Sequence, residues 1–205
     1  MAVQPRLASA VMLLRDDEQG EGIEVFMVRR NVQSDFMPDI YVFPGGSVSE
    51  DDRVAETTEG AYNPVLPSSS DPEGRTALGT GTRAAAIREL FEEANVLLAS
   101  RGNTILAVNA QTVKRFVGYR NAFNQRIGSL VGMLHAEQLV LATERLVYFA
   151  HWITPEGMPK RFDTHFFLAQ APAEQEAIYD RLETSEGRWI RPSVALDDFA
   201  HGSFP

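Results

Sequence analysis

Short apolar runs near the start of the chain predict strands. Residues 7–14 and 23–28 are rich in aliphatic side chains, and the polar segment between them contains two glycines. This pattern is typical of a β-hairpin. Residues 40–43 form a third strand-like run, which we expect Pro44, Gly45 and Gly46 to end in a tight turn with a bare backbone.

The pattern changes over residues 49–82. Ser, Thr, Asp, Glu, Gly and Pro predominate there, and there is little periodicity. We expect this segment to be a long loop or a flexible insertion. A loop of that size is uncommon inside a compact domain and therefore calls for an explanation.

A helix is predicted from Arg83 onward. Its apolar positions recur at i, i+3, i+4 and i+7, which places them on one helix face: Ile87, Leu90, Phe91 and Ala94. We expect the helix to end near Asn95, because asparagine accepts the left-handed conformation of a C-terminal cap.

The second half of the chain alternates between the two kinds of element. One or two helices are predicted over residues 111–141, strands over 146–153, 162–169 and 189–190, and further helices over 172–182 and from Pro192. Strands mixed with a few helices predict an α/β (α+β) fold built in layers. Residues 1–205 are expected to form a single domain with a loop insertion at about 49–82.

Composition excludes several classes of protein. The 205 residues include 19 Lys or Arg and 28 Asp or Glu, for a net charge of −9, and 44% are hydrophobic. This is ordinary globular composition, and its acidic balance argues against a nucleic-acid partner. The chain has no cysteine, which excludes disulfides, thiolate metal sites and cysteine nucleophiles. No apolar stretch is long enough for a membrane span, so we expect no membrane partner and a cytoplasmic location.

The predicted helix from Arg83 carries three carboxylates at i, i+3 and i+4, namely Glu89, Glu92 and Glu93. Their side chains project from one arc opposite the apolar face, where like charges oppose each other. A bound cation would resolve this repulsion, and oxygen ligands of this kind suit Mg²⁺ or Mn²⁺. Arg88 lies four residues before Glu92 and can hold its carboxylate by a charged hydrogen bond. The alternative is an amphipathic helix with a solvated acidic face.

At these residues the sequence resembles the Nudix hydrolase family. The family signature places a glycine, five residues, a glutamate and seven residues before Arg-Glu-aliphatic-any-Glu-Glu-any-Gly-aliphatic. The matching positions are Gly46, Arg88, Glu89, Leu90, Glu92, Glu93 and Val96. The resemblance implies a Nudix-like α/β/α sandwich with a mixed central sheet.

Three features depart from the signature. Gly46 and Arg88 are 42 residues apart, against 14 in the family, which leaves 28 inserted residues within the segment 49–82. Asn95 replaces the box glycine. The first glutamate has no clear equivalent, although Asp51 or Asp52 lies at about the right distance beyond Gly46.

Further motifs are similar to one branch of the family, the peroxisomal coenzyme A diphosphatases with an interrupted box. They are the Phe-Pro-Gly-Gly run at 43–46, the Trp-Ile-Thr-Pro run at 152–155 and the segment 161–168. The resemblance implies cleavage of CoA or acyl-CoA at the pyrophosphate. The glycine that the stricter CoA signature requires four residues before Phe43 is Asp39 here.

We therefore expect a metal-dependent hydrolase that cleaves the pyrophosphate linkage of a small-molecule nucleoside diphosphate derivative. The expected Mg²⁺ or Mn²⁺ ligands are Glu89, Glu92, Glu93 and the carbonyl of Gly46, and Arg88 orients a carboxylate. The general base is left open between Glu89 and a distant glutamate, for which the candidates are Glu137, Glu144 and Glu156. The alternative function is a catalytically weak nucleotide-binding or regulatory module.

Other residues have two interpretations each. Arg30 and Arg161 can bind substrate phosphates, or they can be solvated or paired surface arginines. His151 and His165 are expected to be structural, because two isolated imidazoles give no metal-binding spacing. The apolar stripe of Phe116, Phe123 and Met133 is either core or a subunit contact, so that a homodimer is a possible assembly.

Overall fold

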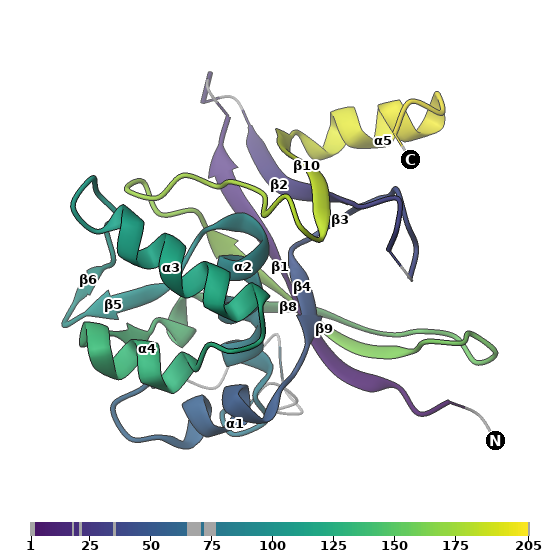
Figure 1. The fold of residues 1–205 in the computed structure, drawn as a ribbon. Helices are drawn as coiled ribbons and strands as arrows, with labels where there is room; N and C mark the ends of the chain where they lie inside the picture. The colour runs from purple at the N-terminus through teal and green to yellow at the C-terminus, as the bar shows by residue number, and fades with distance from the viewer. Residues whose placement is uncertain are drawn as a thin grey trace.

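The computed structural model describes residues 3–17, 19–20, 22–34, 36–64, 71 and 77–204. Its centre is a mixed sheet with the strand order β10-β2-β1-β9-β8, in which β3 also pairs with β2 and β4 with β1 (Figure 1). The strands are β1 (Arg6–Asp16), β2 (Ile23–Arg30), β3 (Tyr41–Val42), β4 (Gly45–Ser47), β8 (Val147–Ile153), β9 (Phe162–Gln170) and β10 (Thr184–Ile190). Only β1 and β9 run parallel among these pairs.

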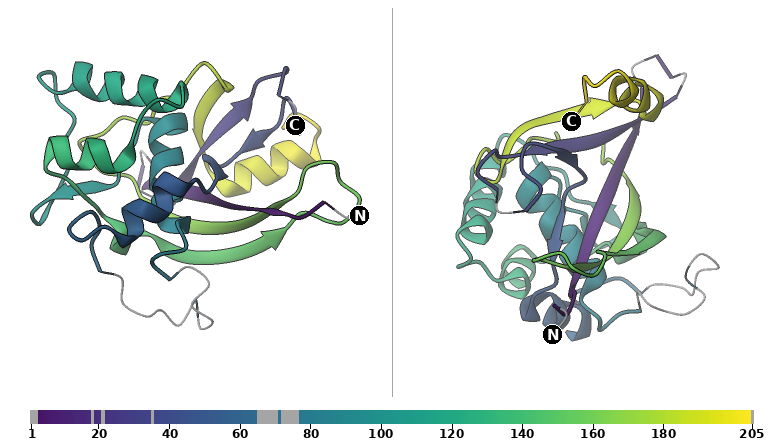
Figure 2. Two further views of the ribbon diagram at one scale, coloured as in Figure 1. Left: turned by 60° about the horizontal axis from the view of Figure 1, so that its bottom comes forward. Right: turned by 90° about the vertical axis from the view of Figure 1, so that its right-hand side faces the viewer.

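Four helices gather on one side of this sheet, and the fifth lies apart from them beside β10 (Figures 1 and 2). The helices are α1 (Glu50–Thr57), α2 (Thr82–Ala94), α3 (Val113–Asn124), α4 (Leu130–Glu137) and α5 (Pro192–Ala200). A small second sheet has the order β6-β5-β7, formed by β5 (Ala99–Arg101), β6 (Thr104–Ile105) and β7 (Val140–Leu141). A 3₁₀ helix, η1, spans Thr143–Arg145.

Alternate side chains of β1 pack into two different hydrophobic clusters, one on each face of the sheet. Val11 and Leu13 are fully buried in the main core beneath α2, whereas Met12 and Leu14 pack on the opposite face of the sheet in the smaller cluster that contains Phe204. Because successive side chains of a strand point to opposite faces, a strand buried on both faces reads as a continuous apolar run. The predicted α/β/α sandwich with a mixed central sheet is confirmed.

Most of the predicted elements are present. The first two strands pair as an antiparallel hairpin, and the strands predicted at 146–153, 162–169 and 189–190 correspond to β8, β9 and β10. The region 111–141 contains two helices, and the last helix begins at Pro192. The stripe Phe116, Phe123 and Met133 belongs to the main core.

The loop predicted over residues 49–82 is wrong for its first part, which is helix α1. Ser49 and Asp52 form a capping box at its start, because each side chain binds the backbone N–H of the other. This cap begins the helix although its sequence has no apolar stripe. Residues 65–70 and 72–76 of the same prediction lie outside the described residues.

Two other predictions need correction. The chain bends at Pro44, but Gly45 and Gly46 then form strand β4 against β1 and not a tight turn. Residues 172–182 are not helical, because their polar groups bind other parts of the chain. The amide N–H of Ile178 donates to the carbonyl of Ala94 (2.9 Å), and the side chain of Gln175 accepts from the N–H of Leu97 (2.8 Å). Strands β5 and β6 were not predicted, and the helical prediction over 111–141 is wrong at its end, where Val140–Leu141 form β7.

None of the helices in the described part of the chain combines the length and the apolar character that a membrane span requires.

Candidate active site

A buried carboxylate fixes the start of α2. Glu56, on α1, accepts hydrogen bonds from four backbone N–H groups around that start, those of Gly79, Gly81, Arg83 and Ala84, at 2.7–2.8 Å. The first N–H groups of a helix have no partner within the helix, and a negative charge at this end also interacts favourably with the helix dipole. The inserted segment therefore caps the helix that carries the predicted site.

Arg88 is the centre of a charged network. Its guanidinium group forms two hydrogen bonds with Asp52 (2.8 and 3.0 Å) and one each with Glu89 (2.9 Å) and Glu92 (2.8 Å). It also donates to the carbonyl of Ser47 on β4 (3.0 Å). Arg88 therefore orients carboxylates, as the sequence predicts, and it joins α1, α2 and β4 at one point.

Asp52 occupies the position of the signature's first glutamate, six residues after Gly46. Its side chain is fully buried and pairs with Arg88. Asp51 instead accepts from the backbone N–H of Leu130 (2.6 Å), at the start of α4. The choice that the sequence leaves between these two aspartates therefore falls on Asp52.

Strand β4 lies directly against the carboxylates of α2. The N–H of Gly45 donates to Glu93 (3.0 Å), and a Cβ atom placed on Gly46 would lie 2.6 Å from Cδ of Glu89. The sequence places these carboxylates on a face turned away from the apolar core. In the structure Glu93 is only 8% exposed, because α2 is covered by β4 on this side as well as by the core.

The enclosed carboxylates are poorly solvated. Burial raises the pKa of Glu89 to about 7, although Arg88 opposes this shift, and the charge of Glu92 adds to it. Burial also raises the pKa of Glu92 and of Glu93, and for Glu93 the nearby charge of Glu89 is the next cause. Asp52, Glu89 and Glu92 all pair with the one guanidinium group of Arg88, so an additional positive charge would be stabilising. An all-oxygen set of this kind fits a hard divalent cation.

A pocket of about 330 Å³ lies beside this cluster. Glu93 and Arg30 both line it, together with Asn31, Gln33, Ser34, Leu182, Glu183 and Thr184. Arg30 is held in place by a hydrogen bond from Nη1 to the carbonyl of Phe36 (2.6 Å). The structure therefore brings the predicted phosphate-binding Arg30 next to a predicted metal ligand.

Sequence reasoning missed Glu183 at this pocket. Glu183 is exposed, and its charge adds to the raised pKa values of Glu92 and Glu93, after burial and closer groups. No sequence motif marks Glu183. Residues 172–182 before it have helix-forming composition, but in the structure they are not helical and pack against the end of α2. Its position could be found only from the fold.

The other predicted site residues lie elsewhere. Arg161 donates to the carbonyls of Thr154 (2.9 Å) and Val3 (2.8 Å), where the β8–β9 connection meets the start of the chain. Glu137 is bound by Tyr119 (3.0 Å) and Arg115 (2.6 Å). Arg161 and Glu137 make none of the described contacts of the Arg88 network.

The two remaining candidates for the general base are also remote from the Arg88 network. Glu144 lines a separate cavity beside Leu14 and Leu98, and Glu156 is an exposed residue of the β8–β9 connection. The described contacts favour neither of them as the general base.

Asn95 preserves the turn at the end of α2. Its φ of 62° is left-handed, as predicted, and its N–H bonds the carbonyl of Phe91 (3.0 Å). Its side chain also donates to the carbonyl of Glu176 (3.3 Å). Asparagine tolerates this conformation better than other non-glycine residues, so the replacement of the box glycine leaves the geometry intact.

Comparison with known proteins gives concordant results. Residues 76–204 match the family model described as the NUDT19 Nudix domain. The acyl-coenzyme A diphosphatase NUDT19 of Xenopus laevis is 25% identical, over 95% of this chain and 60% of its own length. The putative nudix hydrolase 7 of Caenorhabditis elegans is 28% identical, over 88% of this chain and 50% of its own length. The chain thus spans between half and about 60% of these relatives.

A solved structure supports the fold. The crystal structure of a NUDIX hydrolase from Alicyclobacillus acidocaldarius superposes with a TM-score of 0.77, at 24% identity, over 99% of this chain and 86% of that chain. At this level of identity the likeness concerns the arrangement of the elements.

Proposed function

The chain belongs to the Nudix hydrolase family, and from this premise we propose that it is a metal-dependent pyrophosphohydrolase that acts on nucleoside diphosphate derivatives. The observation that carries the proposal is the Arg88 network, in which Asp52, Glu89 and Glu92 meet one guanidinium group. Glu93 adjoins this network at Gly45. A solvated acidic helix face would not require this enclosure.

The proposed ion is Mg²⁺ or Mn²⁺, held by Glu89, Glu92, Glu93 and the carbonyl of Gly46. When bound, it would neutralise phosphate oxygens and acidify a water molecule. Arg88 holds Glu89 and Glu92 in fixed orientations, so that little reorganisation is needed during the reaction. Water attacks one phosphorus, the bond to the bridging oxygen breaks, and two phosphomonoesters leave.

Two residues are proposed as the proton acceptor for the attacking water. Glu89 is one of them, because its carboxylate lies beside Gly46 among the proposed ligands of the ion that would acidify the water. Glu183 is the alternative, because it lines the same pocket as Glu93. Arg30, in the same pocket, is proposed to bind a substrate phosphate. Arg161 remains a predicted phosphate ligand without support from its contacts.

CoA and acyl-CoA are the proposed substrate class. Two observations support this choice: the matching family model carries the NUDT19 name, and the Xenopus laevis relative is named an acyl-coenzyme A diphosphatase. The replacement of the CoA-associated glycine by Asp39 is the feature of this chain that opposes it. A cytoplasmic location and a homodimer remain predictions from the sequence.

The test is a screen for metal-dependent cleavage of CoA, acyl-CoA, ADP-ribose, NADH and dinucleoside polyphosphates, in which the phosphomonoester products are separated and identified by chromatography. Glu92→Gln and Glu93→Gln should each lower turnover by about 100-fold or more and weaken the response to Mg²⁺, because each removes one charged ligand. Glu59→Gln is the matched control, since it removes the same charge from an exposed residue after α1. Near-full activity in Glu93→Gln would defeat the ligand assignment.

The same screen decides the alternative of a catalytically weak nucleotide-binding or regulatory module. Asn95 and the missing first glutamate are the sequence features that favour this alternative. Asn95 forms a left-handed cap, however, and Asp52 pairs with Arg88 six residues after Gly46. Tight nucleotide binding without metal-dependent turnover on any of the substrates would favour the module.

A further inference from the structure

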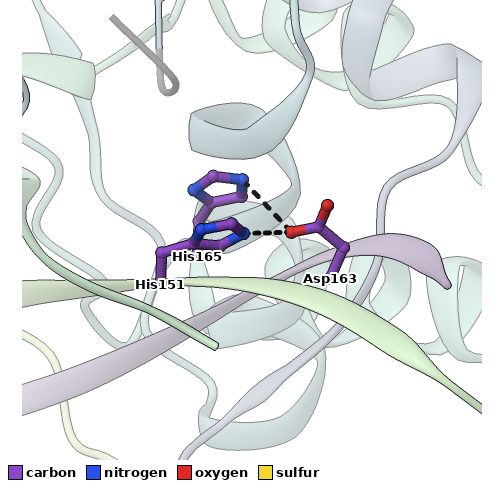
Figure 3. Close-up of side chains that lie close together, drawn as sticks. All are labelled: His151, Asp163 and His165. Carbon is purple, nitrogen blue, oxygen red and sulfur yellow. Dashed lines mark hydrogen bonds and ion pairs between the residues drawn. The ribbon is translucent and has the colours of Figure 1, made fainter. Parts of the chain in front are cut away.

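Two histidines that lie 14 residues apart in the sequence meet on neighbouring strands. His151 on β8 and His165 on β9 are directly opposite each other in the antiparallel pairing. Asp163 precedes His165 by two residues and therefore points to the same face of the sheet. Figure 3 shows the three side chains converging. The expectation that the imidazoles are isolated is wrong, because it lacked the register of this hairpin.

The ligand atoms of these residues share one small volume. One atom from each, the imidazole nitrogens and a carboxylate oxygen, lie within 4.8 Å of one another. The imidazole rings stack with centroids 4.5 Å apart and an angle of 9° between their planes. Both Nε2 atoms face Oδ1 of Asp163, that of His151 in direct contact and that of His165 at 3.8 Å (Figure 3).

This cluster is partly buried and open at one side. The side chain of His165 is 4% exposed, whereas those of His151 and Asp163 are 19% and 30% exposed. His165 also packs near the ring of Tyr148, on the same pair of strands. One ligand is thus held rigidly in the interior, and the other two leave a path for an ion from solvent.

We propose that His151, Asp163 and His165 form a second metal site, for Zn²⁺ or a similar borderline transition-metal ion. Two imidazoles and one carboxylate are a frequent donor set for zinc and leave a fourth position for water. The carboxylates of α2 offer oxygen only and so select harder ions, which gives the two sites different metal preferences.

The spacing is close to what such an ion needs. With bonds of about 2.0–2.1 Å in a tetrahedral arrangement, ligand atoms lie about 3.3 Å apart. The distance between His165 Nε2 and Asp163 Oδ1 is 3.8 Å, so a modest side-chain rotation brings them to the required spacing. The hydrogen bond between His151 and Asp163 would be replaced by the two bonds to the metal. Rotation of the imidazole rings out of their stacked arrangement would direct both nitrogens at one ion.

The proposed site is separate from the carboxylates of α2. In the sheet, Ser9 of β1 lies between Gly46 of β4 on one side and His165 of β9 on the other. Gly46 and His165 are therefore two strand spacings apart, roughly 10 Å. An ion at His165 would therefore not replace one held by Glu89 beside Gly46.

The experiment is a Zn²⁺ titration of tag-free, chelator-stripped protein in excess Mg²⁺, which occupies the oxygen site. Calorimetry gives the stoichiometry, and the visible spectrum of bound Co²⁺ reports nitrogen ligation. We expect one equivalent of Zn²⁺ to bind and to raise the thermal unfolding temperature. His151→Gln, His165→Gln and Asp163→Asn should each weaken this binding by about 10- to 100-fold or more.

The two other histidines of the chain provide matched controls. His135 and His201 are exposed, and His135→Gln and His201→Gln should leave Zn²⁺ binding unchanged. Glu93→Gln should also retain it. The proposal is overturned if the protein binds no stoichiometric Zn²⁺, if His151→Gln binds Zn²⁺ as tightly as the unmodified protein, or if Glu93→Gln abolishes the binding. Because His151 is on an edge strand, its variant serves even if His165→Gln does not fold.

Discussion

A single methyl group at Gly46 is expected to impair catalysis while leaving the fold nearly intact. The Cβ atom of Gly46→Ala would lie 2.6 Å from Cδ of Glu89, where ordinary contacts are 3.4–4 Å, so the carboxylate must move by about 1 Å. A displacement of this size costs roughly 100-fold in rate, or about 2.7 kcal/mol of transition-state stabilisation.

The same substitution should have a small effect on folding. The atoms that the added Cβ meets are the carboxylate at the far end of the Glu89 side chain, which can move by a change of rotamer. A strained rotamer lowers the free energy of unfolding by about 0.5–1.5 kcal/mol. Gly45→Ala is the contrasting variant. Its Cβ atom would lie 2.7 Å from Cα of Ala10, a backbone atom, so that strand β4 itself must shift. Such overpacking costs about 1–3 kcal/mol and lowers the unfolding temperature by about 2–12 °C in a domain of this size.

The assay compares initial rates against Mg²⁺ concentration with thermal unfolding of the metal-free variants. Gly118→Ala is the control, because this exposed glycine of α3 has no atom within 4 Å of the added Cβ. It should leave activity unchanged and gain about 0.5–1 kcal/mol from helix propensity. If Gly46→Ala keeps normal turnover and normal Mg²⁺ dependence, then the carboxylate of Glu89 beside Gly46 does not take part in the reaction.

Three further outcomes follow from the structure. The pKa of Glu89 is about 7 in the folded protein against an ordinary 4.5, so the metal-free protein should gain on the order of 1–3 kcal/mol as pH falls from 7 to 4.5. Thermal unfolding in a chelator measures this gain, and Glu89→Gln should reduce it; an unchanged pH profile would contradict the raised pKa. Glu56→Gln leaves one acceptor oxygen for four N–H groups and should cost at least about 1–3 kcal/mol by denaturant unfolding, whereas a neutral result would show that the cap is dispensable. Asn95→Ala should cost roughly 1 kcal/mol in the same assay because its φ is 62°, while Asn95→Gly should be close to neutral; equal values for the two would refute the left-handed cap.

The helix that carries the site could be predicted because its signals are local. The apolar repeat of Ile87, Leu90, Phe91 and Ala94 fixes one face, and Asn95 marks the end. The contact between Arg88 and Glu92 also follows from helix geometry alone. These features depend on residues within one or two helical turns of each other, so they can be predicted from the sequence alone.

Contacts between distant segments were harder to predict. Asp52 and Arg88 are 36 residues apart, and only the folding of α1 against α2 brings them together. The capping box of Ser49 and Asp52 was a readable signal for α1, but the polar composition of the segment obscured it. Residues 172–182 have helical propensity, which the bonds of Gln175 and Ile178 to other segments override.

The pairing of the central strand β1 also determines the order in which the sheet can form. Strands β2 and β4, which pair with β1, follow it within the first 47 residues, but its parallel partner β9 begins at Phe162, 156 positions after Arg6. A ribosome must therefore translate most of the 205 residues before the second edge of β1 can be paired. Closing so long a loop is entropically costly, and pairings of this kind make folding slow. We therefore expect β9 to dock onto β1 late in folding, after the pairing of β1 with β2 and β4.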